Sequence, residues 1–262
     1  MKKVGVIITV IILIAAIVLI GVIGYGYYQK ATMEVKNPIA TMEVENFGTI
    51  TMELYPDQAP QSVANFIKLA NNGFYDGLTF HRIIKDFMIQ GGDKNGDGTG
   101  SATKSNLQEG LGDDKYSIKG EFISNKVNNT IKFDDGILAM ARSDYSQYSS
   151  DLADESYNSG CSQFFIATAA NTSLNGYYAA FGKVTEGLDI VHNIAAVEVT
   201  TDSQSSSSSS ASSEASKPVN PPVIKSIRVE TYGVDYGMPD MLTPFDYTSW
   251  LYSQYGMSSS GQ

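Results

Sequence analysis

The sequence is poor in the residues from which disulfide scaffolds and metal centres are built. It contains one cysteine and two histidines in 262 residues. One cysteine cannot form an intramolecular disulfide, and two histidines cannot supply a histidine-rich zinc site. Cationic side chains are also few, because 18 lysines and arginines stand against 28 acidic residues, for a formal net charge of −10. Such a surface repels a phosphate backbone, so the composition argues against nucleic-acid binding.

Uncharged apolar residues, in contrast, are concentrated near the start of the chain. Val4–Tyr28 contains no charged residue and consists mostly of Ile, Val, Leu and Ala. At about 1.5 Å per residue, a helix of this length spans a hydrocarbon core of roughly 30 Å. A cleaved signal peptide is the alternative, but it would have a shorter apolar region and small residues at its cleavage site. We therefore expect residues 1–30 to form a cytoplasmic stub and one uncleaved transmembrane helix, with everything after Lys30 extracytoplasmic.

Beyond this anchor, the hydrophobic pattern predicts many short strands and two helices. Ala40–Val44 and Thr49–Leu54 flank a turn, as in a β-hairpin. A helix is expected over Pro60–Asn72, where apolar residues recur every three or four positions, and a second over Leu188–Ala196. Further strands are expected at Thr79–Ile84, Phe87–Gln90, Gly136–Ala141, Phe164–Ala167 and Tyr178–Val184. Many short strands with only two helices indicate an all-β barrel or sandwich.

Composition divides the rest of the chain into a stalk, a domain and a tail. We expect residues 31–38 to be a juxtamembrane stalk and residues 39–232 to be the folded domain. Residues 203–216 include ten serines, a composition typical of flexible segments. Because the apolar residues of Pro222–Tyr232 predict one more strand, we interpret the serine run as a loop inside the domain. The tail, residues 233–262, is rich in aromatic residues without a clear period.

Three separated blocks carry the side chains from which a site could be built. In the first block, Arg82 and Gln90 are long polar residues on strand-like segments, with bulky Phe87 and Met88 between them. A bend at Lys85-Asp86 would bring Phe87 or Met88 beside the guanidinium group. The blocks are Phe80–Asp93, then Gly136–Arg142 with Ser162–Ile166, and then Leu174–Gly176 with Phe181–Val184.

In this order, the blocks resemble the cyclophilin family of peptidyl-prolyl cis/trans isomerases over roughly residues 39–232. The resemblance implies an all-β fold with two helices, in which eight antiparallel strands form a closed barrel. It implies an enzyme that accelerates X–Pro rotation in proline-containing polypeptides without a metal or other cofactor. With the anchor, it suggests a membrane-bound bacterial member that assists the folding of extracytoplasmic proteins.

The resemblance also implies roles for individual residues. Arg82 is the implied catalytic residue, because a cation near the amide nitrogen stabilises the twisted amide more than either planar state. Ser173 and Tyr178 depart from the Trp and His that many members carry; since neither change touches Arg82, we expect activity to survive and cyclosporin binding to weaken. The implied substrate-binding residues are Phe87, Met88, Gln90, Ala141, Arg142, Gln163, Phe165, Leu174 and Tyr178.

Other residues of reactive type are interpreted as structural. His81 has no neighbouring nucleophile in sequence, and Cys161 is of a type that is usually a small buried hydrophobe. Asp93–Gly98 matches the first half of a calcium loop, but Lys104 occupies the position of the required bidentate Glu. Taken singly, each of the apolar residues assigned to the pocket would be interpreted as a core residue.

Two alternatives belong to other functional classes. The first is a non-catalytic chaperone module that binds proline-containing chains, although an intact Arg82 favours the enzyme. The second is a structural surface protein whose aromatic tail, including Trp250, recruits a partner. The acidic, tyrosine-rich segment Asp144–Gly160 is expected to project beside the groove. A solvated loop is the default interpretation of this segment, and a specificity rim is the alternative hypothesis.

Overall fold

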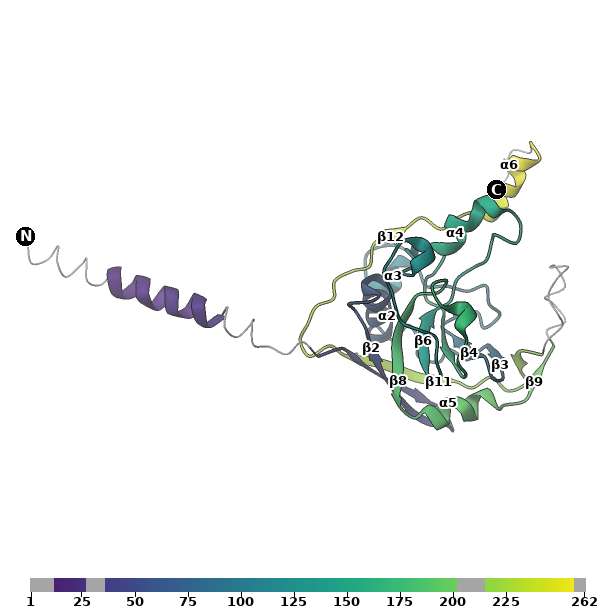
Figure 1. Cartoon of the computed structure of the whole chain (residues 1–262), viewed down its shortest axis with the longest axis horizontal. Coiled ribbons are helices and arrows are strands. Elements are labelled where there is room, and N and C mark those ends of the chain that lie inside the picture. The colour runs from purple at the N-terminus through teal and green to yellow at the C-terminus, as the bar shows by residue number, and fades with distance from the viewer. Residues whose placement is uncertain (1–11, 27–35, 202–214, 257–262) are drawn as a thin grey trace, which may run out of the picture. The chain divides into compact units, whose positions relative to one another are not determined.

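A computed structural model of the chain describes residues 12–26, 36–201 and 215–256 (Figure 1). The chain divides into two units, Met1–Lys36 and Asn37–Gln262. In the first unit, residues 12–26 are helical. No helix within the described ranges is long and apolar enough to cross a membrane. The run Val4–Tyr28, on which the expected anchor depends, extends on both sides beyond residues 12–26.

The second unit is built on an eight-stranded antiparallel sheet (Figure 1). Its strands follow the order β11-β1-β2-β8-β6-β7-β4-β3. They are β1 (Ile39–Val44), β2 (Gly48–Leu54), β3 (Arg82–Ile84), β4 (Met88–Gly91), β6 (Ile137–Met140), β7 (Phe164–Ala167), β8 (Ala180–Glu186) and β11 (Ile224–Glu230). Each of these strands overlaps an apolar run that the sequence predicts as a strand, and β7 matches its prediction at both ends.

The expected closed barrel is wrong, because the sheet curls without joining its two outer strands. In the part of the chain that the structure describes, no ladder pairs β3 with β11, and only a single bridge joins Thr79 to Val223. The outer edge of β3, which would pair with β11 in a closed barrel, contacts a different segment, since the Ile83 N–H donates to the Ser216 carbonyl at 2.7 Å. That segment continues into β10 (Lys217–Pro218), which pairs with β9 (Val199–Thr200).

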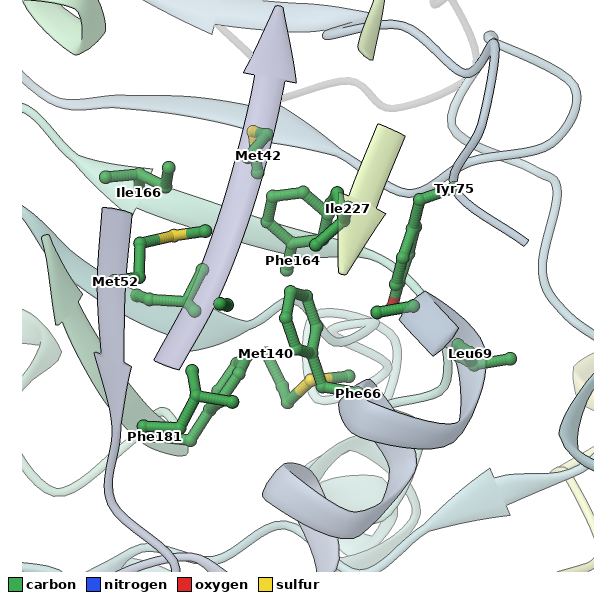
Figure 2. Close-up of a cluster of buried hydrophobic side chains, with 14 of the residues drawn as sticks. Met42, Met52, Phe66, Leu69, Tyr75, Met140, Phe164, Ile166, Phe181 and Ile227 are labelled. Atoms are coloured by element: carbon green, nitrogen blue, oxygen red, sulfur yellow. The ribbon is translucent and has the colours of Figure 1, made fainter. Parts of the chain in front are cut away.

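The main core lies between one face of the sheet and helix α2 (Pro60–Asn71). Phe66 of α2 points into an aromatic cluster, with ring centroids 5.2 Å from Tyr75, 5.6 Å from Phe164 and 5.2 Å from Phe181 (Figure 2). All four side chains are fully buried. Burying side chains of this size contributes about 1.5–3 kcal/mol each, so this cluster is a main source of the domain's stability.

The start of α2 is stabilised by a residue far away in the sequence. Pro60 occupies the first turn, and Ala59 before it has no side chain that could cap the helix. The buried Glu121 carboxylate replaces a cap, since it accepts the N–H groups of Gln61 and Ser62, both at 2.8 Å, and the Ser62 hydroxyl at 2.7 Å. Burial raises the pKa of Glu121 despite these three donated hydrogen bonds.

Both predicted helices are confirmed, as α2 and α5 (Leu188–Ala195), but the expectation of two helices is too low. Short helices also form outside the predicted segments, because side-chain caps and tertiary contacts stabilise turns that have no strong periodic pattern. The additional elements are α3 (Lys104–Leu107), α4 (Ala153–Tyr157), α6 (Tyr247–Gln254), β5 (Ser117–Ile118) and β12 (Met241–Leu242). Most of the serine run, residues 203–214, and most of the expected stalk, residues 31–35, lie outside the described residues.

Candidate active site

The face of the sheet opposite the main core carries a second, smaller hydrophobic cluster. Side chains alternate between the two faces of a strand. In β7, Phe164 and Ile166 therefore enter the main core, whereas Phe165 and Ala167 enter the second cluster. The buried members of this second cluster are Met88, Phe133, Ile137, Ala139, Phe165, Ala167, Leu174 and Ala180.

Arg82 lies in line with this second cluster across four neighbouring strands. It pairs in register with Gln90 of β4, Gln90 pairs with Phe165 of β7, and Phe165 pairs with Ala139 of β6. The hairpin between β3 and β4 turns at Asp86, which adopts a left-handed conformation with φ of 56°. This turn confirms the expected bend, and it places the Met88 sulfur 3.9 Å from Arg82 Nη1.

A relay of side-chain amides orients the Arg82 guanidinium group. Gln163 Nε2 donates to the carbonyls of Gly98 at 3.0 Å and Gly100 at 2.9 Å, which leaves its Oε1 facing Gln90. Gln90 Nε2 donates to that oxygen at 2.9 Å, and Gln90 Oε1 accepts from Arg82 Nη1 at 3.2 Å. Two backbone carbonyls therefore determine the direction of every hydrogen bond up to the cation.

The loop that supplies those carbonyls is shaped by Asp93. This buried carboxylate accepts the backbone N–H groups of Asn95, Asp97 and Gly98. Its oxygens are thus committed to holding the turn, in the manner of an Asx turn. Residues Asp93–Gly98, which match the opening of a calcium loop, thus place the Gly98 carbonyl where it accepts a hydrogen bond from Gln163.

The second cluster lies beside Arg82 and contains the apolar residues predicted for the pocket. Phe165 stacks on Phe133 with ring centroids 5.8 Å apart and meets Tyr178 edge to face at 5.6 Å. Met88 and Leu174 are buried against the same rings, and Phe87 packs there partly exposed. The structure thus brings together all the apolar residues predicted for the pocket.

Phe133 is a pocket residue that sequence reasoning missed. It precedes β6 in a segment without regular secondary structure, so no periodic pattern marks it. Its backbone is held from two sides, because its N–H donates to Asn175 Oδ1 at 2.8 Å and its carbonyl accepts the Asn171 N–H at 3.2 Å. The nearest sequence signal was the apolar pair Ile131 and Phe133, two residues apart.

Arg142 is held in place at the border of the pocket. Its guanidinium group lies over the ring of Tyr178, 4.7 Å from the centroid, and over the ring of Tyr157 at 5.4 Å. Its Nε also donates to the Tyr177 carbonyl at 3.1 Å. The Ala141 N–H is engaged as well, since it donates to the Gln163 carbonyl at 2.9 Å. Tyr178 therefore serves both the pocket and Arg142 through a cation–π contact.

Ser173 lies next to Leu174, at the predicted rim of the pocket. It lies exposed in a short 3-10 turn, Thr172–Leu174, where its N–H and its hydroxyl both donate to Asn171 Oδ1, at 3.1 and 2.6 Å. Leu174 is buried in the pocket, whereas Ser173 places no ring at the rim.

His81 and Cys161 are buried away from solvent. Neither ring nitrogen of His81 has a hydrogen-bond partner in the described part of the chain, and burial lowers the pKa of the imidazole. Burial raises the pKa of the Cys161 thiol to about 11, which keeps it protonated and weakly nucleophilic at neutral pH. Both environments suit structural residues better than catalytic ones.

The curled sheet, with a polar relay leading to an arginine beside an apolar cluster, is a cyclophilin fold. The family model for cyclophilin type peptidyl-prolyl cis-trans isomerases matches residues 39–229. The chain belongs to this family of enzymes.

Named relatives agree with this assignment. The chain is 41% identical over 156 residues to peptidyl-prolyl cis-trans isomerase B of Bacillus subtilis, a match that covers 60% of this chain and 90% of that protein. It is 38% identical over 171 residues to isomerase cyp15 of Rhizopus delemar, where the match covers 64% of this chain but 23% of that longer protein.

Solved structures show the same fold. A cyclophilin type isomerase from Cryptosporidium parvum superposes with a TM-score of 0.54 at 27% identity, over 74% of this chain and 97% of that one. A structure of this isomerase in the presence of the dipeptide Ala-Pro superposes with a TM-score of 0.51 at 28% identity.

Proposed function

We propose that this chain accelerates cis/trans rotation about X–Pro bonds in polypeptides, with Arg82 as the catalytic residue. The observation that carries the proposal is the position of Arg82, which a hydrogen-bonded relay orients beside the second apolar cluster, where we place the proline pocket. The pocket is of the chemistry that would hold a proline ring.

The reaction needs no covalent step. Partial double-bond character gives the X–Pro amide a rotation barrier of about 18–20 kcal/mol. In the twisted transition state the nitrogen has lost its conjugation and carries a lone pair. A cation held near that nitrogen stabilises the twisted state more than either planar ground state, which lowers the barrier. The relay through Gln90 and Gln163 supplies the preorganisation, since it sets the direction of Arg82 before substrate arrives.

The proposed substrates are proline-containing polypeptides. The structural relative solved in the presence of Ala-Pro supports this substrate class. Phe87, Met88, Phe165, Leu174 and Tyr178 would surround the proline ring, while the backbone at Ala141 and Arg142 would align the substrate chain. Because the Ala141 N–H is committed to the sheet, its carbonyl is the group left for that alignment.

We further propose that the domain acts outside the cell membrane of a bacterium, tethered by Val4–Tyr28, and assists the folding of extracytoplasmic proteins. The support is the length and apolar character of that run. Protease treatment of intact cells tests the orientation. We expect the domain to be degraded from outside and the N-terminal segment to stay in the membrane after alkaline extraction. Protection of the domain in intact cells would contradict this location.

Exchange NMR on a short prolyl peptide tests the catalytic proposal. We expect fast exchange with the full chain and a loss of about 10²–10³ in rate for Arg82→Ala, the usual cost of removing an electrostatic donor. Arg228→Ala is the matched control, because Arg228 is an arginine of β11 that pairs with Asp76 outside the candidate site. Peptide binding without faster exchange in the unmodified chain would instead indicate a non-catalytic proline-binding chaperone module.

A further inference from the structure

The C-terminal tail returns to the border of the candidate active site. Its strand β12 pairs antiparallel with β5, with Met241 opposite Ile118 and Leu242 opposite Ser117. The Asp240 N–H also donates to Gln61 Oε1 at 2.6 Å, which ties the tail to the first turn of α2. These contacts fasten residues 240–242 to the folded domain, just before Pro244 and Phe245.

Beyond this strand, aromatic rings join the tail to the acidic insertion at 144–160. Tyr145 of the insertion contacts Phe245 at 5.2 Å and stacks on Tyr247 at 6.0 Å with an interplanar angle of 4°. Tyr148 meets Tyr247 at 4.5 Å, and Tyr247 in turn stacks on Trp250 at 5.7 Å. The helices of the two segments, α4 and α6, accordingly lie near one another (Figure 1).

This aromatic cluster borders a groove that begins at the amide relay. The groove has a volume of about 450 Å³. Gln90, Gln163 and Arg142 line it on the side of the candidate active site. Tyr145, Pro244 and Phe245 line it from the insertion and the tail. Gln90 and Gln163 therefore connect Arg82 to a groove whose other side is formed by the insertion and the tail.

The insertion and the tail, which line this side of the groove, carry negatively charged side chains and no positively charged ones. Residues 144–157 and 233–256 together contain seven acidic residues and no lysine or arginine. Asp144 and Asp246 are exposed and adjoin the lining residues Tyr145 and Phe245. The groove's own cations are Lys115 and Arg142, and the latter is covered by aromatic rings. An acidic rim favours the approach of basic ligand segments.

We propose that the tail and the insertion form a second wall of the substrate groove. This wall binds the residues that flank the proline of an extended polypeptide and favours basic residues there. Phe245 and Tyr145 are its contact residues, and Asp144 and Asp246 supply its charge preference. The inference rests on the proposed isomerase function, since the wall acts on substrates of the same site.

The experiment compares peptides of different length and flanking charge on the full chain. A tetrapeptide centred on Ala-Pro has one residue on each side of that pair, whereas a twelve-residue peptide with the same centre has five on each side, with lysines among them. For Phe245→Ala we expect kcat/KM on the long peptide to fall about 2- to 10-fold through KM, the value of an aromatic contact. The tetrapeptide should change by less than about twofold. Tyr255→Ala, in the same tail but 70% exposed, is the matched control and should behave as the unmodified chain.

A second pair of variants tests the charge preference. Asn caps helices as well as Asp does, so Asp246→Asn removes a charge without removing the cap that Asp246 provides to α6. With Asp144→Asn added, we expect the preference for lysine-flanked over glutamate-flanked peptides to fall about 2- to 5-fold, and to fall similarly in high salt.

Each other result has a defined meaning. Phe245→Ala variants that process all long peptides like the unmodified chain would overturn the wall, and Tyr145→Ala repeats the test from the opposite side if Phe245→Ala misfolds. A variant that turns over the tetrapeptide faster would also overturn it, because the tail would then be an inhibitory cover. Failure of the unmodified chain to accelerate the tetrapeptide would refute the proposed function itself.

Discussion

The two faces of the central strands use the same backbone for different tasks. On one face Phe164 is fully buried among Phe66, Tyr75 and Phe80, where no solvent reaches it. One residue further along, Phe165 faces the other way and packs on Phe133 and Tyr178 beside Arg82. The closed face is covered by α2, whereas the other face ends at a groove. Adjacent residues of one strand can therefore serve stability and substrate binding separately.

Polar groups differ between the faces in the same way. On the closed face, Asn65 accepts the Tyr116 hydroxyl at 2.7 Å and donates to the Cys161 carbonyl at 2.6 Å, so its polar atoms are used up within the core. On the open face, the relay of Gln163 and Gln90 ends at Arg82, a partly exposed cation. A buried network of the first kind holds loops together, while the second kind delivers an oriented charge to a ligand.

Truncating each of the two phenylalanines to alanine provides the strongest test of this comparison. Phe164→Ala should lower the free energy of unfolding by about 3–5 kcal/mol, the usual cost of truncating a fully buried Phe, without changing kcat/KM per folded molecule. Phe165→Ala should lower stability less and reduce kcat/KM by about tenfold or more, because the proline ring loses apolar contact. Urea unfolding and exchange NMR measure the two effects. Equal losses of activity in both variants would show that the faces are not separable.

Disrupting the amide relay should have a smaller effect, confined to kcat. Gln163→Leu removes the group that orients Gln90 and thereby Arg82, so we expect kcat to fall about 10- to 100-fold with little change in KM. A double-mutant cycle isolates the positioning role, since Gln163→Leu should have no further effect on kcat once Arg82 is alanine. Additive losses in the double variant would mean that Gln163 contacts substrate independently of Arg82.

The smallest expected effect is on stability and concerns the ion pair between Arg228 and Asp76, away from the core and the candidate site. Arg228 donates to both Asp76 oxygens, at 2.7 and 2.6 Å, and this bond lowers the pKa of Asp76 below its ordinary value. The ionised carboxylate therefore stabilises the fold fully above its unfolded pKa, and the benefit disappears as pH falls through the lower folded pKa. Because the pair is largely exposed, Asp76→Asn should cost only about 0.2–1 kcal/mol at pH 7.

Urea unfolding of Asp76→Asn at a series of pH values checks this expectation. The difference from the unmodified chain should shrink on acidification, and catalysis should be unchanged throughout. A difference that stays constant down to pH 2 would show that the carboxylate charge is not the source of the stabilisation.

The strands that carry the site could be predicted because strand periodicity is local, whereas the grouping of Met88 and Phe165 with Arg82 was implied by the family resemblance. The register of β3, β4 and β7 places these three residues on one face. The bend at Lys85-Asp86 could be predicted too, since a short polar turn between two apolar runs indicates a hairpin. The closed barrel could not be decided in this way, because closure depends on which segment pairs with the edge of β3, and Ser216 occupies it.

The amino-acid sequence by itself determined the strands, the two main helices and the alternation of side chains along a strand, because these depend on neighbours two to four residues apart. Only the tertiary structure decided how the site is completed. Glu121 caps a helix that starts 61 residues earlier, Gly98 and Gly100 orient Gln163, and Phe245 reaches the groove from the tail. Such contacts leave no periodic trace in the sequence, since they arise where loops far apart along the chain meet in the folded domain.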